Sequence, residues 1–199
     1  MKTFKTFLLL GCLSVLTFAS CTTNEEDPTL TKEEINLAYQ SMKGDYAGNL
    51  IYTDPSTTST NDVNDTLSVN WQINSDSMLV IKNLPSKPIA AVITDSKLRA
   101  AIAEQPTQEL KCYYSIYNIS PVGFLVNPLA ATFNVTVDGT SHTIQVAFYV
   151  YNSYSYGVYN ATSNLMQMQV LIGGVYVDGV LDKTLLSSTA FLGFSGTKQ

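Results

Sequence analysis

Hydrophobic and polar residues alternate along most of the chain after residue 45. The clearest run is Leu67, Val69, Trp71 and Ile73, with polar residues between them. A period of two is typical of a strand with one buried face. We predict eight to ten strands joined by short connections, which favours an antiparallel barrel or sandwich. The runs span 46–52, 67–73, 78–82, 109–119, 133–137, 140–146, 166–172, 175–181 and 189–197.

Two segments have helical spacing instead. Thr31 and Glu34 form the pattern of a capping box, which predicts a helix over about 31–43. Asp95 is a suitable N-cap for a second, short helix over about 95–105. The first helix is expected to pack against the main body or to close one end of it.

Turn residues separate several of the strands. Asp138-Gly139 is a strong hairpin signal, because both residues of the turn need a positive φ. Gly173-Gly174 predicts another turn between two strands. A two-residue turn at 138–139 pairs Val137 with Thr140, Val135 with His142, and Phe133 with Ile144, which places His142 on the apolar face.

The first twenty residues have the features of a secretory signal. Lys2 and Lys5 precede an apolar run over 7–18, which is too short to span a bilayer as a helix. Phe18-Ala19-Ser20-Cys21 resembles a bacterial lipobox, with Phe in place of the commoner Leu. The resemblance implies cleavage before Cys21 and its lipidation; the alternative is an ordinary signal peptide with a chance cysteine. Several acyl chains on one residue give stable membrane anchoring.

Residues 21–30 are expected to form a lipidated cysteine followed by an acidic tether, and residues 31–199 a single domain. The cluster Glu25-Glu26-Asp27 has two interpretations. It is a solvated spacer, or it resembles the acidic export signals of Bacteroidetes surface lipoproteins. If it is a spacer, the protein is an outer-membrane lipoprotein that could face either side of that membrane. If it is an export signal, the protein lies on the cell surface.

Charge and cysteine content narrow the function classes. The chain of 199 residues has 11 Lys and Arg against 16 Asp and Glu, and removal of residues 1–20 changes the net charge from −5 to −7. Such an acidic protein is not expected to bind nucleic acid. Once Cys12 is removed with the signal and Cys21 is acylated, Cys112 has no partner for a disulfide. Its place on an apolar strand face predicts a buried thiol.

Catalytic patterns are weak. His142 is the single histidine, and no Gly-x-Ser-x-Gly motif accompanies it. The Glu residues fall in the tether or near the helices, so no pair of buried carboxylates is expected on the strands. Asp62, Asn64 and Asp65 could offer oxygen ligands to calcium, but the loop lacks the EF-hand pattern. We therefore expect no enzyme, no cofactor and no metal.

The best candidate binding segment is rich in tyrosine. Tyrosine, serine, asparagine and glycine supply rigid aromatic faces and adaptable hydrogen bonds, which suit sugar faces or peptides. The alternative is that these tyrosines are ordinary strand residues. The candidate residues are Tyr151, Tyr154, Tyr156, Tyr159 and Asn160.

Two short sequences suggest a covalent modification. Asp65-Thr66-Leu67 and Asp76-Ser77-Met78 resemble the three-residue O-glycosylation signal of Bacteroidetes. Thr66 and Ser77 are therefore candidate glycosylation sites.

The ends of the domain carry a family resemblance. Gly44-Asp-Tyr46-Ala-Gly48 follows a short helix and opens the first strand, and the last strand ends Phe194-Ser-Gly196-Thr-Lys198. This layout resembles the small calycin-like lipoproteins of Bacteroidetes, many of unknown function. The resemblance implies a single meander closed as a calycin-like barrel, with a β-sandwich as the alternative, and a pocket for a small apolar ligand. The helix at 95–105 departs from a plain barrel.

Two functions remain as hypotheses. The first is a non-catalytic binding module for a glycan, a peptide or a small apolar ligand. The second is a structural or accessory lipoprotein that docks onto an envelope protein. An open lumen lined by Trp71, Phe133, Val135 and Ile144 would favour the first, and a filled barrel with a large exposed aromatic patch would favour the second.

Overall fold

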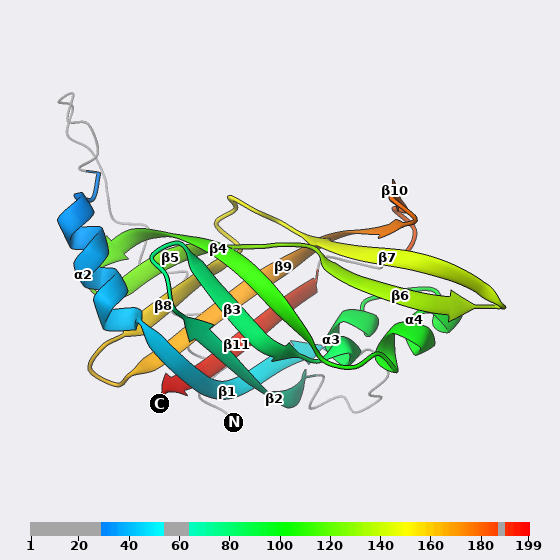
Figure 1. Ribbon diagram of the computed structural model, residues 1–199, viewed down its shortest axis with the longest axis horizontal. Helices are drawn as coiled ribbons and strands as arrows, with labels where there is room; N and C mark the ends of the chain where they lie inside the picture. The colour runs from blue at the N-terminus through cyan, green and yellow to red at the C-terminus, as the bar shows by residue number, and fades with distance from the viewer. Residues whose placement is uncertain (1–28, 54–63, 187–189) are drawn as a thin grey trace.

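The computed structural model describes residues 29–53, 64–186 and 190–199. Figure 1 shows the chain, with the remaining residues as a thin trace. The predicted signal peptide, Cys21 and the cluster Glu25-Glu26-Asp27 lie outside the described residues, as does Asp62 of the candidate calcium loop.

The two predicted helices are present, with slightly shorter bounds. Helix α2 (Lys32–Met42) begins at the capping box: the Glu34 amide donates to Thr31 Oγ1 at 3.2 Å, and the Thr31 amide donates to Glu34 Oε2 at 2.8 Å. Helix α4 (Ser96–Ala103) begins at Asp95, whose carboxylate accepts the Leu98 amide at 2.7 Å. A further short helix, α3 (Ser86–Ala90), was not expected from the sequence.

The fold is mainly β, as predicted. The described strands are β1 (Gly44–Thr53), β2 (Asn64–Ile73), β3 (Met78–Leu84), β4 (Gln108–Ile119), β5 (Val122–Pro128), β6 (Ala131–Val137), β7 (Thr140–Phe148), β8 (Tyr156–Asn160), β9 (Leu165–Val177), β10 (Val180–Leu181) and β11 (Ala190–Lys198).

Eight of these strands close an antiparallel barrel, in the order β1-β2-β3-β4-β5-β8-β9-β11. β11 pairs with β9 on one side and with β1 on the other, so the cylinder has no open edge. Gly48 faces Gly196 across the β1–β11 seam. The predicted barrel is thus confirmed, and the sandwich alternative is not adopted.

One hairpin leaves the meander. β5 pairs with β8, and the hairpin β6–β7 instead joins the second half of β9. Its turn and register agree with the sequence prediction: Asp138 and Gly139 have φ of 51° and 81°, and His142 faces Val135. We call the β6–β7 hairpin, together with the second half of β9, the extension. It lies beside the barrel at the right of Figure 1, and helix α4 contacts its strand β6.

The predicted turn at Gly173-Gly174 is wrong. β9 continues through both glycines to Val177. β7 pairs Ala147 with Gly174 and Phe148 with Ile172, so Gly173 is an extra residue, a β-bulge. A bulge bends a strand. Here it lies where β9 passes from the barrel into the extension.

Aromatic side chains fill the barrel. Trp71 stacks on Tyr46, with ring centroids 5.6 Å apart and planes 3° apart, and Phe194 meets Trp71 edge to face at 6.4 Å. Tyr159 meets Tyr46 edge to face at 6.1 Å. These four side chains are at most 2% exposed. In the described part of the barrel, these four side chains fill the lumen.

The other predicted lumen residues lie elsewhere. Phe133 and Val135 are on β6 and Ile144 is on β7, so all three belong to the extension, where they are buried. The sequence placed them correctly on an apolar face. It did not show that this face lies outside the cylinder that holds Trp71.

Candidate functional site

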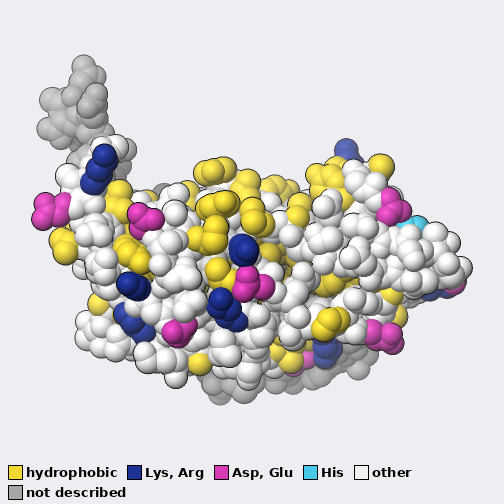
Figure 2. All heavy atoms as spheres, viewed as in Figure 1, with side chains coloured by type: hydrophobic (Ala, Val, Ile, Leu, Met, Phe, Trp, Pro, Cys, Tyr) yellow, Lys and Arg dark blue, Asp and Glu magenta, His cyan; other side chains and the backbone are white. Residues whose placement is uncertain are grey.

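The outer face of β3 and β4 carries charge. Lys82 Nζ lies 3.5 Å from Glu109 Oε2, and Lys111 Nζ lies 4.0 Å from Glu109 Oε1. Figure 2 shows charged side chains in the middle of this face, with hydrophobic ones gathered above them. Exposed ion pairs of this kind contribute little to stability. They mark a solvated surface.

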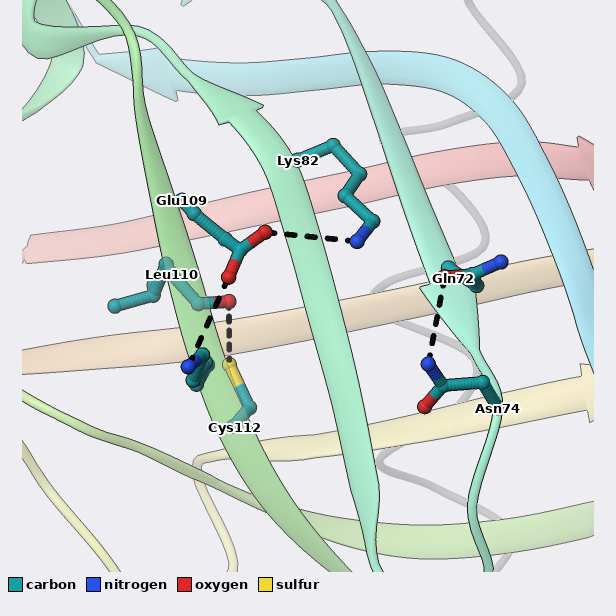
Figure 3. Close-up of polar contacts among 7 residues, drawn as sticks. Gln72, Asn74, Lys82, Glu109, Leu110 and Cys112 are labelled. Atoms are coloured by element: carbon teal, nitrogen blue, oxygen red, sulfur yellow. Dashed lines mark hydrogen bonds and ion pairs between the residues drawn. The ribbon is translucent and has the colours of Figure 1, made fainter.

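Cys112 lies near this cluster (Figure 3). Its Sγ lies 4.0 Å from the Leu110 carbonyl oxygen, and its side chain is fully buried. Burial raises the pKa of the thiol well above its usual range. A reactive cysteine needs the opposite shift. The structure thus agrees with the prediction of a buried, unreactive thiol.

The strands that follow β4 around the barrel are different. β5, β8 and β9 contain no Lys, Arg, Asp or Glu, and they lie side by side. β11, the next strand, has only Lys198, whose Nζ donates to the Ser41 carbonyl at 3.0 Å. In Figure 1, β9 and β11 pass behind β3 and β4.

We call this surface the charge-free wall. It consists of partly or fully exposed side chains that alternate with buried core residues on the same strands. Its members are Leu125, Tyr156, Val158, Asn160, Leu165, Gln167, Gln169, Phe191, Ser195 and Thr197.

The predicted tyrosine segment borders this wall. Tyr151 and Tyr154, in the connection before β8, are 81% and 59% exposed. The connection is held in place: Gln169 Nε2 donates to the Tyr154 carbonyl at 2.8 Å, and buried Ser155 Oγ accepts the Leu171 amide at 3.1 Å. Tyr156 begins β8, where its half-buried side chain faces outward. The structure therefore brings Tyr151, Tyr154 and Tyr156 to one edge of the wall.

Tyr159 and Asn160 do not belong to the same loop. Residues 156–160 form strand β8, and Tyr159 points into the barrel with 2% exposure. Its hydroxyl donates to Asn164 Oδ1 at 3.0 Å. The Asn160 side chain accepts the Thr162 amide at 2.9 Å, which shapes the β8–β9 turn. Tyr159 is thus a core residue, because alternation along β8 sends every second side chain inward.

Several wall residues were not singled out from the sequence. Gln167 and Gln169 fall within the predicted strand 166–172 and were not candidate binding residues. Two exposed tyrosines that lie outside the wall, Tyr117 (54%) and Tyr149 (44%), were also not among the candidate residues. The signal in the sequence is the absence of Lys, Arg, Asp and Glu from 122–128, 156–160 and 165–177, which the hairpin strands 131–137 and 140–148 share.

A groove lies at the other end of β8, between α2 and the turns β4–β5 and β8–β9. Its volume is about 490 Å³. Glu34, Leu37 and Ser41 of α2 form one wall, and Pro121 and Asn160 line the opposite side. Leu37 is 63% exposed. The groove is large enough for a small molecule.

His142 lies at the rim of the extension and contacts Asp178. Its Nδ1 is 2.8 Å from Asp178 Oδ2, and the Thr143 amide donates to Asp178 Oδ1 at 2.8 Å. Both hydrogen bonds lower the pKa of Asp178, and the one with His142 has the larger effect. The contacts tie β7 to the turn after β9. The His142 side chain is 30% exposed, so His142 lies at the edge of the predicted apolar face.

The predicted modification sites are accessible. Thr66, on β2, and Ser77, in the β2–β3 turn, are both exposed. Among the described residues, no group of His, Cys, Asp and Glu could hold a metal ion. Nor is any helix in the described ranges long and apolar enough to cross a membrane.

Comparison with known proteins places the chain in a family without giving it an activity. No curated protein matches the sequence. Residues 41–177 match a family described as "Domain of unknown function (DUF4840)". This match starts in α2 and ends with β9, so it covers most of the barrel and the whole β6–β7 hairpin. The chain therefore belongs to the DUF4840 family.

Proposed function

We propose that this protein is a lipid-anchored, non-catalytic binding module of the cell envelope, and that it binds through its outer surface. The observation that carries this proposal is the charge-free wall. Loss of charged residues with enrichment of tyrosine is typical of surfaces that are covered by a binding partner. A solvated barrel face is expected to resemble the Lys82–Glu109–Lys111 surface instead.

Because the barrel is filled, the proposed binding site lies on its outer surface. Calycin-like proteins hold ligands in the lumen, and Trp71, Tyr46 and Phe194 occupy that space here. Likeness to the calycin-like lipoproteins of Bacteroidetes is supported by the seam, because Gly48 and Gly196 of the two terminal motifs face each other there. The likeness then concerns the architecture, and the ligand site is on the exterior.

Lipid anchoring is argued from the sequence. Acylation of Cys21 would leave ten residues before the start of α2, so the domain would stay within about 35 Å of the outer-membrane surface. Labelling with radioactive palmitate should mark the wild-type protein and leave Cys21→Ala unlabelled. Label that persists in Cys21→Ala would refute this assignment.

The acidic cluster and the candidate glycosylation sites belong to the same proposal. If Glu25-Glu26-Asp27 directs surface export, replacing all three by Ala should protect the domain from protease added to whole cells. Unchanged digestion would favour a plain spacer. Intact-mass measurement of the native protein tests sugar at Thr66 and Ser77, whose replacement by Ala should remove the added mass.

The wall itself is tested by placing charge on it. In a Cys21→Ala background, which cannot attach through lipid, Val158→Glu and Gln167→Glu should each abolish binding of the protein to isolated cell envelopes, because a carboxylate would be buried beneath the partner. Lys111→Glu, on the charged face, is the matched control and should bind as the wild type does. Equal binding by all three variants would show that the wall is not the binding surface.

The alternative function is an accessory lipoprotein that docks onto an envelope protein. The filled barrel and the exposed Tyr151 and Tyr154 favour it over a carrier of small apolar ligands. If this alternative holds, cross-linking from Tyr154 should trap a protein on intact cells. The groove beside α2 offers a separate site for a small ligand, which Leu37→Arg should block without affecting the wall.

A further inference from the structure

Two exposed tyrosine rings rest on glycines at opposite ends of the wall. The Tyr117 ring reaches from β4 across Gly123 of β5, and a Cβ placed on that glycine would lie 2.8 Å from Tyr117 Cε2 and Cζ. The Tyr149 ring lies over Gly173, where a Cβ would be 3.1 Å from Tyr149 Cδ2. A ring that rests on bare backbone is supported on one side. The two tyrosines remain 54% and 44% exposed.

Paired positions on β5, β8 and β9 connect these two rings. Gly123 pairs with Val158, which pairs with Gln167, and Leu125 pairs with Tyr156, which pairs with Gln169. Gly173 lies six residues beyond Gln167 on the same side of β9, and Leu171 between them is buried at 4% exposure. At about 3.3 Å per residue, the path is about 20 Å long. We call Tyr117, Val158, Tyr156, Gln167, Gln169, Tyr154 and Tyr149 the tyrosine stripe.

The composition of the stripe selects among possible ligands. It offers aromatic faces and two side-chain amides on strands without charge, so an anionic polymer would find no Lys or Arg on β5, β8 or β9 to pair with. The anchors of a protein partner are enriched in Trp, Tyr and Arg that fill desolvated pockets. The stripe has tyrosine but neither Trp nor Arg. Its tyrosines sit on a sheet surface rather than in a pocket.

Neutral sugars match these groups. The C–H face of a pyranose ring packs against an aromatic ring, and amides exchange hydrogen bonds with sugar hydroxyls. A row of such groups about 20 Å long suits several sugar units in line. Tyr117 and Tyr156 lie on strands. The connection that carries Tyr149 and Tyr154 is held by the Tyr149 amide, which donates to the Leu171 carbonyl at 2.9 Å, and by Gln169 Nε2, which donates to the Tyr154 carbonyl at 2.8 Å. Binding therefore loses little conformational entropy.

We propose that the tyrosine stripe binds a neutral, linear polysaccharide, with the Tyr117 and Tyr149 rings as stacking platforms at its two ends. This inference rests on the proposed function, since it names the ligand class of the charge-free wall. It adds two residues, Tyr117 and Tyr149, that the wall proposal does not need.

The test is affinity electrophoresis of the full-length protein in detergent, through gels that contain a soluble glucan, mannan or xylan, with polygalacturonate as the acidic counterpart. At least one neutral polymer should retard the wild type, and polygalacturonate should not. Tyr117→Ala and Tyr149→Ala should each weaken retardation by about tenfold, the usual scale of one lost aromatic contact. Tyr117→Phe should retain it, because the ring remains.

Gly123→Ala tests the position of the Tyr117 ring while the tyrosine itself is kept. The new Cβ would displace the Tyr117 ring, which is the flexible end of a side chain, so the fold should survive while sugar binding weakens as in Tyr117→Ala. Tyr176→Ala, on β9 beyond the bulge, is the control for loss of a tyrosine. Circular dichroism of every variant confirms that the barrel is intact.

Three outcomes would overturn the inference. They are the absence of retardation by any of the neutral polymers, retardation by polygalacturonate alone, and equal retardation of the wild type, Tyr117→Ala and Tyr149→Ala. The proposed function is judged separately. If Val158→Glu abolishes envelope binding and no polysaccharide retards the protein, the wall binds a protein and only the polysaccharide assignment fails.

Discussion

Closure of the barrel depends on a pair of glycines at the seam between β1 and β11. A Cβ on Gly48 would lie 2.2 Å from the Ser195 carbonyl oxygen and 2.4 Å from Gly196 Cα. These atoms belong to the backbone of the neighbouring strand, so no side-chain rotation relieves the clash. Gly48→Ala must therefore separate the two strands where they complete the cylinder.

The size of the effect follows from this geometry. Overpacking a core costs about 1–3 kcal/mol when side chains can adjust. Because the clash here is with backbone, we expect Gly48→Ala to reach the upper end, about 3 kcal/mol. For a domain of this size, that lowers Tm by about 6–12 °C. A stability of about 5–15 kcal/mol is usual, so the variant should fold but be clearly weakened.

Gly193 provides a matched control on the same seam. It pairs with Ile51, and a Cβ there would lie 3.6 Å from the Ile51 carbonyl oxygen, an ordinary contact. Gly193→Ala should therefore leave stability unchanged or raise it by about 0.4–1 kcal/mol, through the less flexible unfolded chain. The two variants make the same chemical change and differ only in the space available.

The assay is urea and thermal unfolding followed by tryptophan fluorescence. Trp71 is the single tryptophan, and its Cη2 would lie 2.5 Å from a Cβ on Gly196, so its emission reports on the seam. Gly48→Ala should shift the unfolding midpoint down and expose Trp71 to water. Equal midpoints for Gly48→Ala and Gly193→Ala would refute the argument that backbone contact at this seam requires glycine.

Three other predictions follow from single residues. Burial raises the pKa of the Cys112 thiol, so the thiol should resist iodoacetamide in the folded protein and react within minutes in urea. Rapid labelling of the native state would contradict its burial. Tyr46→Phe removes the hydroxyl that donates to the Met42 carbonyl at the end of α2, and should cost about 1–2 kcal/mol in urea unfolding. Tyr52→Phe loses a bond to the partly exposed Asp65 and should cost less; the reverse order would show that the α2 contact is unimportant. The His142 hydrogen bond lowers the pKa of Asp178 in the folded protein. The ionised carboxylate therefore stabilises the fold above its ordinary pKa of 3.8, and this contribution is lost as the pH falls through the lower pKa of the folded state. The Tm difference between wild type and Asp178→Asn should therefore be present at neutral pH and vanish in acid; a constant difference would mean that the effect is not the titration of Asp178.

Local features were predictable because they depend on neighbours in sequence. The capping box at Thr31 and the hairpin at Asp138-Gly139 were both found where the residues indicated. Each is determined by a few consecutive residues and their backbone angles. The burial of Cys112 followed in the same way, from its place on the apolar side of an alternating strand.

The division of the candidate binding segment was not predictable from its composition. Tyr151, Tyr154, Tyr156 and Tyr159 have the same side chain, and three of them face outward while Tyr159 packs on Tyr46. The difference arises because residue 156 begins a strand between β5 and β9. Position relative to that strand, rather than residue type, decides which tyrosines a ligand can reach.

The sequence by itself determined that the domain is mainly β, which face of each main strand is buried, and where the first helix begins. Only the tertiary structure decided that β8 follows β5 in the barrel, that Gly173 forms a bulge, and that Tyr117 and Tyr149 lie at the two ends of one surface. The physical reason is that alternation specifies the faces of a strand and leaves its neighbours open. The choice of neighbours depends on contacts between distant segments, such as the β1–β11 seam, and the charge-free wall exists only after that choice is made.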